Sequence, residues 1–182
     1  MDFTECVESR RSVRQFTDEP LSRETILEIV RLASFAPSWK NTQTVRYTIV
    51  TDRERMEKIA SECVLGFQYN TQTLTRCTAL AVQSVVTHVA GVEKDGSYTT
   101  SKGSAWEVFD AGVSAQTFCL AARSLGVGTC IMGIFDETKI APLADLPENQ
   151  KVSALIAMGY PGETPKAPRR KDPEELVRFL SE

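Results

Sequence analysis

The sequence predicts a single α+β domain over residues 1–182, an α/β/α sandwich in which helices cover both faces of a central sheet. Segments with the helical i, i+3, i+4 spacing alternate along the chain with short β-branched runs. The run 78–86 is almost continuously apolar, which is typical of a strand covered on both faces. No internal repeat or interdomain linker divides the 182 residues, a length that fits one domain.

The amino-terminal half is predicted to alternate between helices and one strand. A short helix is expected over 3–9. Ser22 has the character of an N-cap, and the apolar spacing after it predicts a second helix that Pro37 ends. Residues 45–50 form a β-branched and aromatic run that predicts a strand, and Asp52 is placed to cap a third helix.

The carboxy-terminal half contains a loop and the longest predicted helix. Residues 87–103 combine glycines with hydroxyl side chains and predict a loop or mobile lid. Residues 106–125 predict a helix rich in small side chains, which let another helix approach closely, so it is expected at the centre or at a subunit interface. Short strands are expected at 128–133 and 152–158 with a helix between them, and Asp172 begins a last helix.

Composition excludes several classes of function. The net charge of −3 argues against a nucleic-acid partner. No apolar run approaches the roughly 20 residues that span a bilayer, and the first 14 residues lack a signal-peptide core, so we expect a cytoplasmic protein without a membrane partner. The five cysteines are odd in number and never form a CxxC pair, which argues against a disulfide framework and a metal site. A single histidine, His88, makes a Ser-His-Asp hydrolase improbable.

Two basic clusters stand at opposite ends of the chain. They supply 7 of the 21 basic residues: Arg10, Arg11, Arg14, Lys166, Arg169, Arg170 and Lys171. Guanidinium groups bind a phosphate monoester in a bidentate fork, and Ser12 adds a hydroxyl. If the fold joins the clusters they make one anion site; the alternative for the first cluster alone is a solvated basic turn.

Two further segments could approach a flat ligand. In 36–43, Ser38, Asn41 and Gln43 offer donors and acceptors suited to the edge of a polar heterocycle, although an ordinary helix-to-strand connection would explain them too. The glycines of 126–133 would let the backbone come close to a flat group, and this run carries no side chain suited to acid–base chemistry.

Four segments in this order resemble the nitroreductase family over most of the chain: RRSVRQF, APSWKNTQ, LAARSLGVGTCIMG and MGYPGETPKAPRRKDPEELV. The resemblance implies a nitroreductase-like fold with a central mixed sheet. It also implies an intertwined homodimer with FMN at the interface, each site being built from both chains.

The resemblance also implies which residues bind FMN. The phosphate and ribityl chain would be held by Arg10, Arg11, Ser12 and Arg14 together with Arg169 and Arg170. The segment that wraps the flavin would be Pro37, Ser38, Trp39 and Asn41, with Gln43 just beyond it. Cys130, Ile131, Met132 and Gly133 would pass against the isoalloxazine ring, with a backbone N–H of Met132 or Gly133 reaching N5. Asn70 would contact the pyrimidine side of the ring.

Departures from the family pattern affect the acceptor more than the flavin. Many relatives have proline and tryptophan where this chain has Thr44 and Val45, and a basic residue where it has Thr73. Either difference would alter substrate access or the charge near the ring.

The function that the resemblance implies is ping-pong hydride transfer from NADH or NADPH through FMN to an electron-poor small molecule, such as a nitroaromatic, a quinone or an enone. Because the cofactor carries the chemistry, no side chain is expected to be catalytic, and Glu107 and Asp110 are expected to be structural or capping groups. Two alternatives stay open: a non-catalytic FMN-binding protein (a flavin reservoir or redox sensor), and a family variant acting as a flavin reductase, dehalogenase or dehydrogenase.

Overall fold

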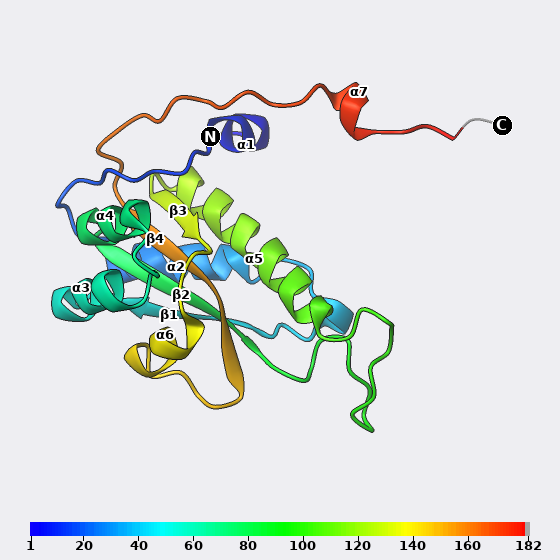
Figure 1. Cartoon of the computed structure of the whole chain (residues 1–182). Helices are drawn as coiled ribbons and strands as arrows, with labels where there is room; N and C mark the ends of the chain where they lie inside the picture. Colours follow the sequence, from blue (N-terminus) through cyan, green and yellow to red (C-terminus); the bar gives the residue numbers. More distant parts are fainter. Residues whose placement is uncertain (181–182) are drawn as a thin grey trace.

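The computed structural model describes residues 1–180 and has three layers (Figure 1). The central sheet has the order β1-β2-β4-β3, with strands Val45–Val50, Ala79–Val86, Gln150–Gly159 and Gly128–Met132 respectively. Helices α2 (Arg23–Ala33) and α5 (Ala105–Ser124) cover one face. Helices α3 (Arg53–Glu62), α4 (Gln68–Arg76) and α6 (Glu137–Leu143) cover the other. The predicted α/β/α sandwich is confirmed.

The sheet is antiparallel in all three pairings of its four strands, whereas a mixed sheet was expected. Among residues 1–180 the parallel pairing is limited to an isolated bridge between Ser12 and Thr129. The continuous apolar run in β2 reports burial on both faces, which helices achieve here over antiparallel strands as well, so it carries no information on strand direction.

Alternating side chains of the two central strands divide the core into two clusters. Leu80 of β2 and Leu155 of β4 point to the α3, α4 and α6 side. Ala81 of β2 and Ile156 of β4 point to the α2 and α5 side. The alanine of β2 lets α5 lie close to the sheet, and fully buried Phe118 of α5 stacks on Tyr47 with ring centroids 4.7 Å apart.

Several predicted helix starts are confirmed by their caps. Ser22 accepts the backbone N–H of Thr25, and Asp52 accepts that of Arg55. Helix α2 ends at Ala33, before Pro37. Helix α4 was not predicted, because its buried positions include Asn70 and Thr73 beside Leu74 and therefore show no apolar periodicity.

Helix α5 was expected at the centre or at a subunit interface, because its small residues let another helix approach closely. The central position is confirmed: Ala115 is buried in the cluster shared with α2, as are Ala121 and Ala122. Between Ala111 and Ala122 the exposed small residue is Gly112, with no atom within 4 Å of the position of a Cβ. Beside it Val108 is 72% exposed, so α5 presents an uncovered apolar face.

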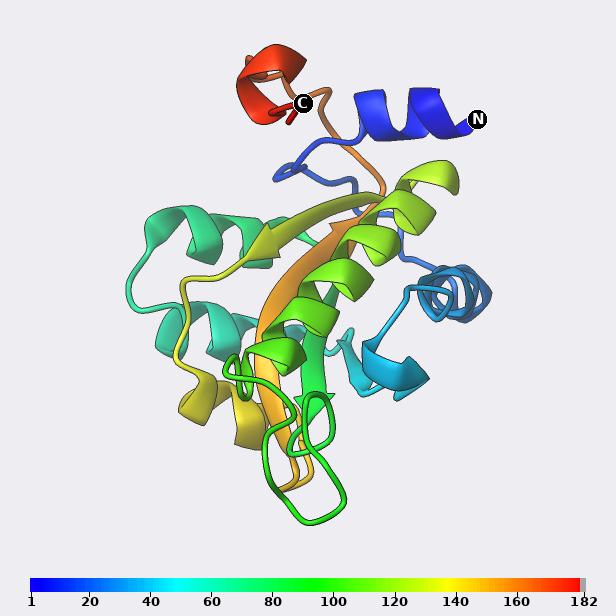
Figure 2. The same cartoon turned by 90° about the vertical axis from the view of Figure 1, so that its right-hand side faces the viewer.

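The amino-terminal helix and the chain beyond β4 lie on the same side of the sandwich, at the top of Figure 1 and Figure 2. Helix α1 (Phe3–Ser9) precedes an extended arm, and the chain beyond β4 leaves the body toward the single turn of α7 (Pro173–Leu176). Residues 87–103 form the predicted loop. Within residues 1–180 no helix is long and apolar enough to cross a membrane.

Candidate functional site

The amino-terminal arm pairs with the free edge of β3. Ser12 bridges Thr129, and the backbone N–H of Val13 donates to the carbonyl of Thr129 at 2.9 Å. The approach is close, because a Cβ on Gly128 would lie 3.0 Å from that of Val13. The structure therefore places the first basic cluster beside the strand predicted to pass the flavin ring.

Beyond Thr129 the outer edge of β3 pairs with no other strand or bridge among residues 1–180. The Thr129 carbonyl faces the arm, so by the two-residue period of a strand the backbone groups of Ile131 face the same side, followed by Gly133. Ile131 is 45% exposed, and a Cβ on Gly133 would meet no atom within 4 Å. Met132 is buried and pairs with Leu155. Two backbone N–H groups, those of Met132 and Gly133, were predicted to reach N5 of the flavin. The one with open space beside it is that of Gly133.

The arginines of the arm differ in how far the chain itself occupies them. Arg11 Nη1 donates to the carbonyls of Glu8 and Arg10 at 2.6 and 2.8 Å, and Arg14 Nη1 donates to that of Ser12 at 3.3 Å. Arg10 donates no side-chain hydrogen bond to residues 1–180, which leaves its guanidinium available. Burial raises the pKa of the Cys130 thiol, and Arg14 and Arg10 lower it, which places both cations near β3.

A further cation near this arm was missed by the sequence analysis. Arg123, in the last turn of α5, donates from Nε to the Ser9 hydroxyl at 3.0 Å and lines one pocket with Arg10 and Arg11. Its place in the last turn suits the helix dipole, so its sequence position alone suggested only a structural role.

The second basic cluster begins at the same place but is not in contact with the first. The chain leaving β4 pairs with the arm through Phe16 and Pro161. Arg169 and Arg170 lie farther along, exposed, and make no hydrogen bond or ion pair with the rest of the chain that the structure describes. The structure thus pairs the segments from which the two clusters extend. It leaves the guanidinium groups of Arg169 and Arg170 apart from that of Arg10.

Asn70 lies buried on α4 next to the end of β3. Its Nδ2 donates to the carbonyl of Ile134 at 3.0 Å. Thr73, one turn further, is buried and donates to the Tyr69 carbonyl, so it presents neither charge nor hydroxyl to a ligand. The departure noted at this position therefore removes a cation from this side.

The segment Ala36–Gln43 has a strained backbone. Lys40, Asn41 and Gln43 have φ of 45°, 56° and 49°, a left-handed conformation that costs non-glycine residues about 1–3 kcal/mol each. Trp39–Asn41 forms a single 3₁₀ turn, η1. Such strain persists only where surrounding contacts impose it, and it concentrates at functional sites.

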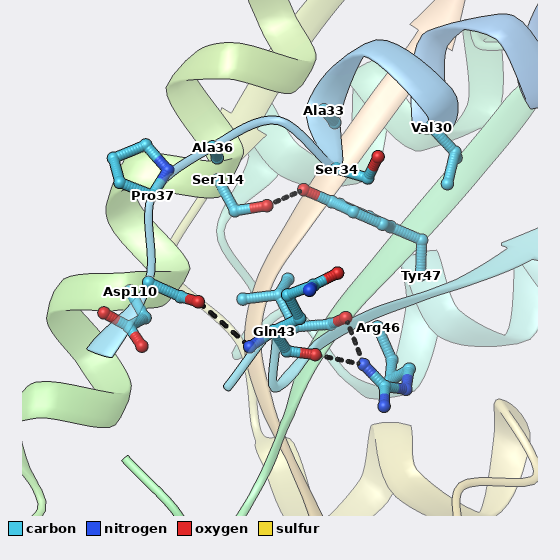
Figure 3. A pocket seen from close by; sticks show the side chains of 12 residues that line it. Val30, Ala33, Ser34, Ala36, Pro37, Gln43, Arg46, Tyr47, Asp110 and Ser114 are labelled. Atoms are coloured by element: carbon cyan, nitrogen blue, oxygen red, sulfur yellow. Dashed lines mark hydrogen bonds between the residues drawn. The ribbon is translucent and has the colours of Figure 1, made fainter. Parts of the chain in front are cut away.

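Hydrogen bonds from three directions hold this segment, and Figure 3 draws those that Gln43 makes. The Ser38 hydroxyl accepts the N–H of Gln43 at 2.9 Å, and Arg46 donates to the Gln43 carbonyl at 2.6 Å. Asp110, on α5, accepts the N–H of Trp39 at 2.9 Å. Behind the segment lies a pocket whose wall also includes the hydrogen-bonded pair Tyr47 and Ser114.

The two buried carboxylates of α5 have matching roles. Asp110 holds Trp39, and Glu107 accepts the N–H of His88, whose φ is +59°, at 2.6 Å. Both anchor backbone beside residues of positive φ, which supports the expectation that they are structural. His88 is exposed in the turn after β2, as expected of a strand-end histidine.

The strained segment also contacts the first turn of α5 and the loop 87–103. Trp39 and Trp106 lie with ring centroids 4.6 Å apart, and Lys40 pairs with Glu93 at 3.1 Å. Thr99 donates to the same carboxylate at 2.6 Å. Trp39 Nε1 is buried without a hydrogen-bond partner among residues 1–180.

Most of the predicted site residues thus form two groups on opposite sides of α5: the strained segment beside Asp110, and the arm with β3, whose Ile131 lines a pocket with Val108 and Gly112 of α5. Asp110 marks the strained segment and Arg123 marks the arm. They are 13 residues apart, or about 20 Å at 1.5 Å per residue. Figure 2 shows η1, in light blue, on one side of α5 and β3 on the other. Within one chain the structure does not bring these groups together.

The residues present fit FMN. An available guanidinium and the arm hydroxyl suit a phosphate, and open space at Gly133 beside the free edge of β3 suits a flat ring. Within residues 1–180 no cluster of His, Cys, Asp or Glu could hold a metal. Fold and site together define a flavin-binding class of α/β/α protein.

Comparison with known proteins identifies the family. A model of the nitroreductase family matches residues 7–160, and the chain belongs to that family. It is similar to a putative NADH dehydrogenase/NAD(P)H nitroreductase of Archaeoglobus fulgidus, with 29% identity covering 96% of this chain and 97% of that protein.

Two further similarities agree with this assignment. An FMN reductase (NAD(P)H) of Bacillus subtilis is 31% identical, covering 92% of this chain and 68% of that one. The crystal structure of a nitroreductase family protein from Streptococcus pneumoniae aligns with a TM-score of 0.86 at 19% identity, covering 98% and 100%, and shows the fold.

Asp110 provides a test of how the strained segment is held. Asp110→Ala leaves the Trp39 N–H unpaired and should lower the free energy of unfolding by about 1–3 kcal/mol in urea. Asp110→Asn keeps an acceptor oxygen and should stay near wild type at neutral pH.

The pH dependence of the same variants follows from burial, which raises the pKa of Asp110 against the opposing Trp39 N–H. The folded state then holds this proton more tightly than the unfolded chain. The free energy of unfolding that protonated Asp110 contributes is complete below the pKa of the unfolded chain, about 3.9. It is lost as pH rises through the raised pKa of the folded state. The stability of wild type relative to Asp110→Asn should fall from acid to neutral pH, and a constant or rising difference would contradict this account.

Proposed function

We propose that this chain is a cytoplasmic, NAD(P)H-dependent FMN oxidoreductase that passes hydride to an electron-poor small molecule such as a nitroaromatic, a quinone or an enone. The observation that carries the proposal is the arm beside β3: a free guanidinium at Arg10 lies at the same edge as the open backbone of Ile131 and Gly133. The names of the relatives from Archaeoglobus fulgidus and Bacillus subtilis support a nicotinamide donor and a flavin.

Each part of the site has a separate task in this proposal. Bound FMN supplies the acceptance of hydride from NAD(P)H and its donation to the acceptor. Arg10 and Arg14, with Arg169 and Arg170, neutralise the phosphate. The N–H of Gly133 donates to the ring edge, and Asn70 borders the pyrimidine side. No chain residue needs to move a proton near neutral pH, in keeping with the structural roles of Glu107 and Asp110.

We further propose that the functional unit is a homodimer with two FMN sites. The strained segment, which supplies Pro37, Ser38, Trp39, Asn41 and Gln43, cannot reach the arm of its own chain across α5, so it would wrap the flavin held by the partner. Two features support this: the uncovered face of α5 at Val108 and Gly112, and the exposed apolar residues of the carboxy-terminal segment, with Phe179 and Leu180 each 84% exposed.

The cofactor and its phosphate contacts are tested together. The purified protein should be yellow and release FMN rather than FAD on denaturation, because the two arginine clusters suit a terminal phosphate.

Arg10→Ala should weaken FMN binding by roughly ten- to a hundredfold, since a charge-assisted hydrogen bond contributes about 1.5–3 kcal/mol. Titration of the apoprotein measures this, with Arg76→Ala, on α4, as the matched control. Release of FAD, or wild-type affinity in Arg10→Ala, would overturn the assignment.

The kinetic mechanism is tested with the lone histidine. Initial rates against NAD(P)H at several fixed acceptor concentrations should give parallel double-reciprocal lines, because donor and acceptor use the same flavin in turn. His88→Gln should reduce flavin within about threefold of the wild-type rate, since exposed His88 lies outside every site segment. Intersecting lines would indicate a ternary complex, and a hundredfold loss in the variant would reveal an acid–base role.

A further inference from the structure

The chain leaving β4 is docked onto the amino-terminal arm by a run of specific contacts. The N–H of Thr17 donates to the Tyr160 carbonyl at 2.9 Å, and that of Gly162 donates to the Gln15 carbonyl at 2.9 Å. A Cβ on Gly162 would lie 3.1 Å from the backbone carbon of Phe16, so the two backbones meet at a position that excludes a larger residue.

Glu163 closes this run with its side chain. One carboxylate oxygen, Oε1, accepts the backbone N–H groups of Arg14 and Gln15 at 2.9 and 3.1 Å. A charged acceptor makes hydrogen bonds roughly twice as strong as a neutral one. The arm residue that it grips is Arg14, which belongs to the first basic cluster, and the chain that carries Glu163 continues to the second.

Beyond Glu163 the chain is stiff and has no other attachment of its own before α7. Thr164 and Pro165 line a pocket with Arg10 and Arg11, so the chain starts out beside the first cluster. Pro165 and Pro168 restrict the segment to extended conformations, and no helix or strand forms between Glu163 and α7. The direction in which this segment leaves the body therefore determines where Arg169 and Arg170 arrive.

The segment from Glu163 to Arg169 is long enough that a small change in its direction moves Arg169 appreciably. Six residues separate Glu163 from Arg169, about 19 Å at about 3.1 Å per residue, so a deviation of about 10° displaces Arg169 by about 3 Å. That displacement is as large as a hydrogen bond, whose donor–acceptor distance is about 2.9 Å.

We propose that Glu163 is a positioning residue for cofactor binding: by accepting the N–H groups of Arg14 and Gln15, it fixes the point at which the carboxy-terminal segment leaves the body, so that Arg169 and Arg170, which lie apart from Arg10 in this structure, can reach the phosphate site that Arg10 begins. This inference rests on the proposed FMN function and adds a residue that acts by holding backbone N–H groups, although its side chain also lines the pocket of Arg10 and Arg11. It acts on the phosphate end alone, because the ring is held elsewhere, at β3 and the strained segment.

The sign of the effect separates this role from simple electrostatics. Glu163→Ala removes a negative charge near a phosphate site, and Coulomb attraction alone would then make FMN bind more tightly. The positioning role has the opposite consequence. Glu163→Ala should bind FMN about tenfold more weakly than wild type, and Glu163→Gln, whose amide oxygen still accepts both N–H groups, should stay within about threefold.

The experiment is titration of each full-length apoprotein with FMN and, in parallel, with riboflavin, which lacks the phosphate. Glu163→Ala should lose affinity for FMN and keep wild-type affinity for riboflavin. Glu148→Ala should change neither, because this exposed carboxylate precedes β4 whereas Glu163 follows it. In the background Arg169→Ala/Arg170→Ala, adding Glu163→Ala should cause little further loss, because the positioned groups are already absent.

Three results would overturn the proposal. Equal losses for FMN and riboflavin would mean that Glu163 supports the fold generally, tighter FMN binding would mean that its charge dominates, and an unchanged affinity would mean that the contact is idle. Failure of the proposed function is a separate result, since wild-type protein would then show no preference for FMN over riboflavin.

Discussion

The arrangement of this protein depends on α5, a helix of 20 residues that runs the length of the sandwich and is buried along one side. Its inner face packs on the sheet and on α2. Its two ends fasten the segments on which function rests: Asp110 anchors Trp39, and Arg123 bonds Ser9 beside the arm. Because a helix is rigid, it keeps these segments about 20 Å apart within a chain. The proposal that each site uses a second chain rests on that separation.

The two groups of residues are also held by different physical means. The arm is an added strand-like partner at the edge of β3, fitted against glycines where larger side chains would collide. The segment Ala36–Gln43 is a strained connection that buried carboxylate and hydroxyl groups hold in place. The arm thus presents charge at a defined position, and the segment presents a shaped wall, which suits the phosphate and the ring of one cofactor.

Much of the fold could be predicted because it is recorded in local patterns. Ser22 and Asp52 cap helices where expected, and the apolar run of β2 correctly indicated a strand covered on both faces. Helix α4 could not be predicted, because the polar residues Asn70 and Thr73 occupy its buried face. The antiparallel direction of the strands could not be predicted, because no local sequence pattern depends on it. The clustering of the arginines predicted an anion site. The contacts of Glu163, Asp110 and Arg123 join residues more than 70 positions apart and have no signature in the sequence.

The central claim, that each FMN site combines the arm of one chain with the strained segment of its partner, is tested most directly with mixed dimers. One chain carries Arg10→Ala and the other Trp39→Ala/Asn41→Ala, and FMN is held at a concentration where neither homodimer retains it. In the heterodimer one site receives both defects and the other receives none. The account predicts one tightly bound FMN per heterodimer. If each site belonged to a single chain, every site would be defective, and a heterodimer without bound FMN would contradict the account.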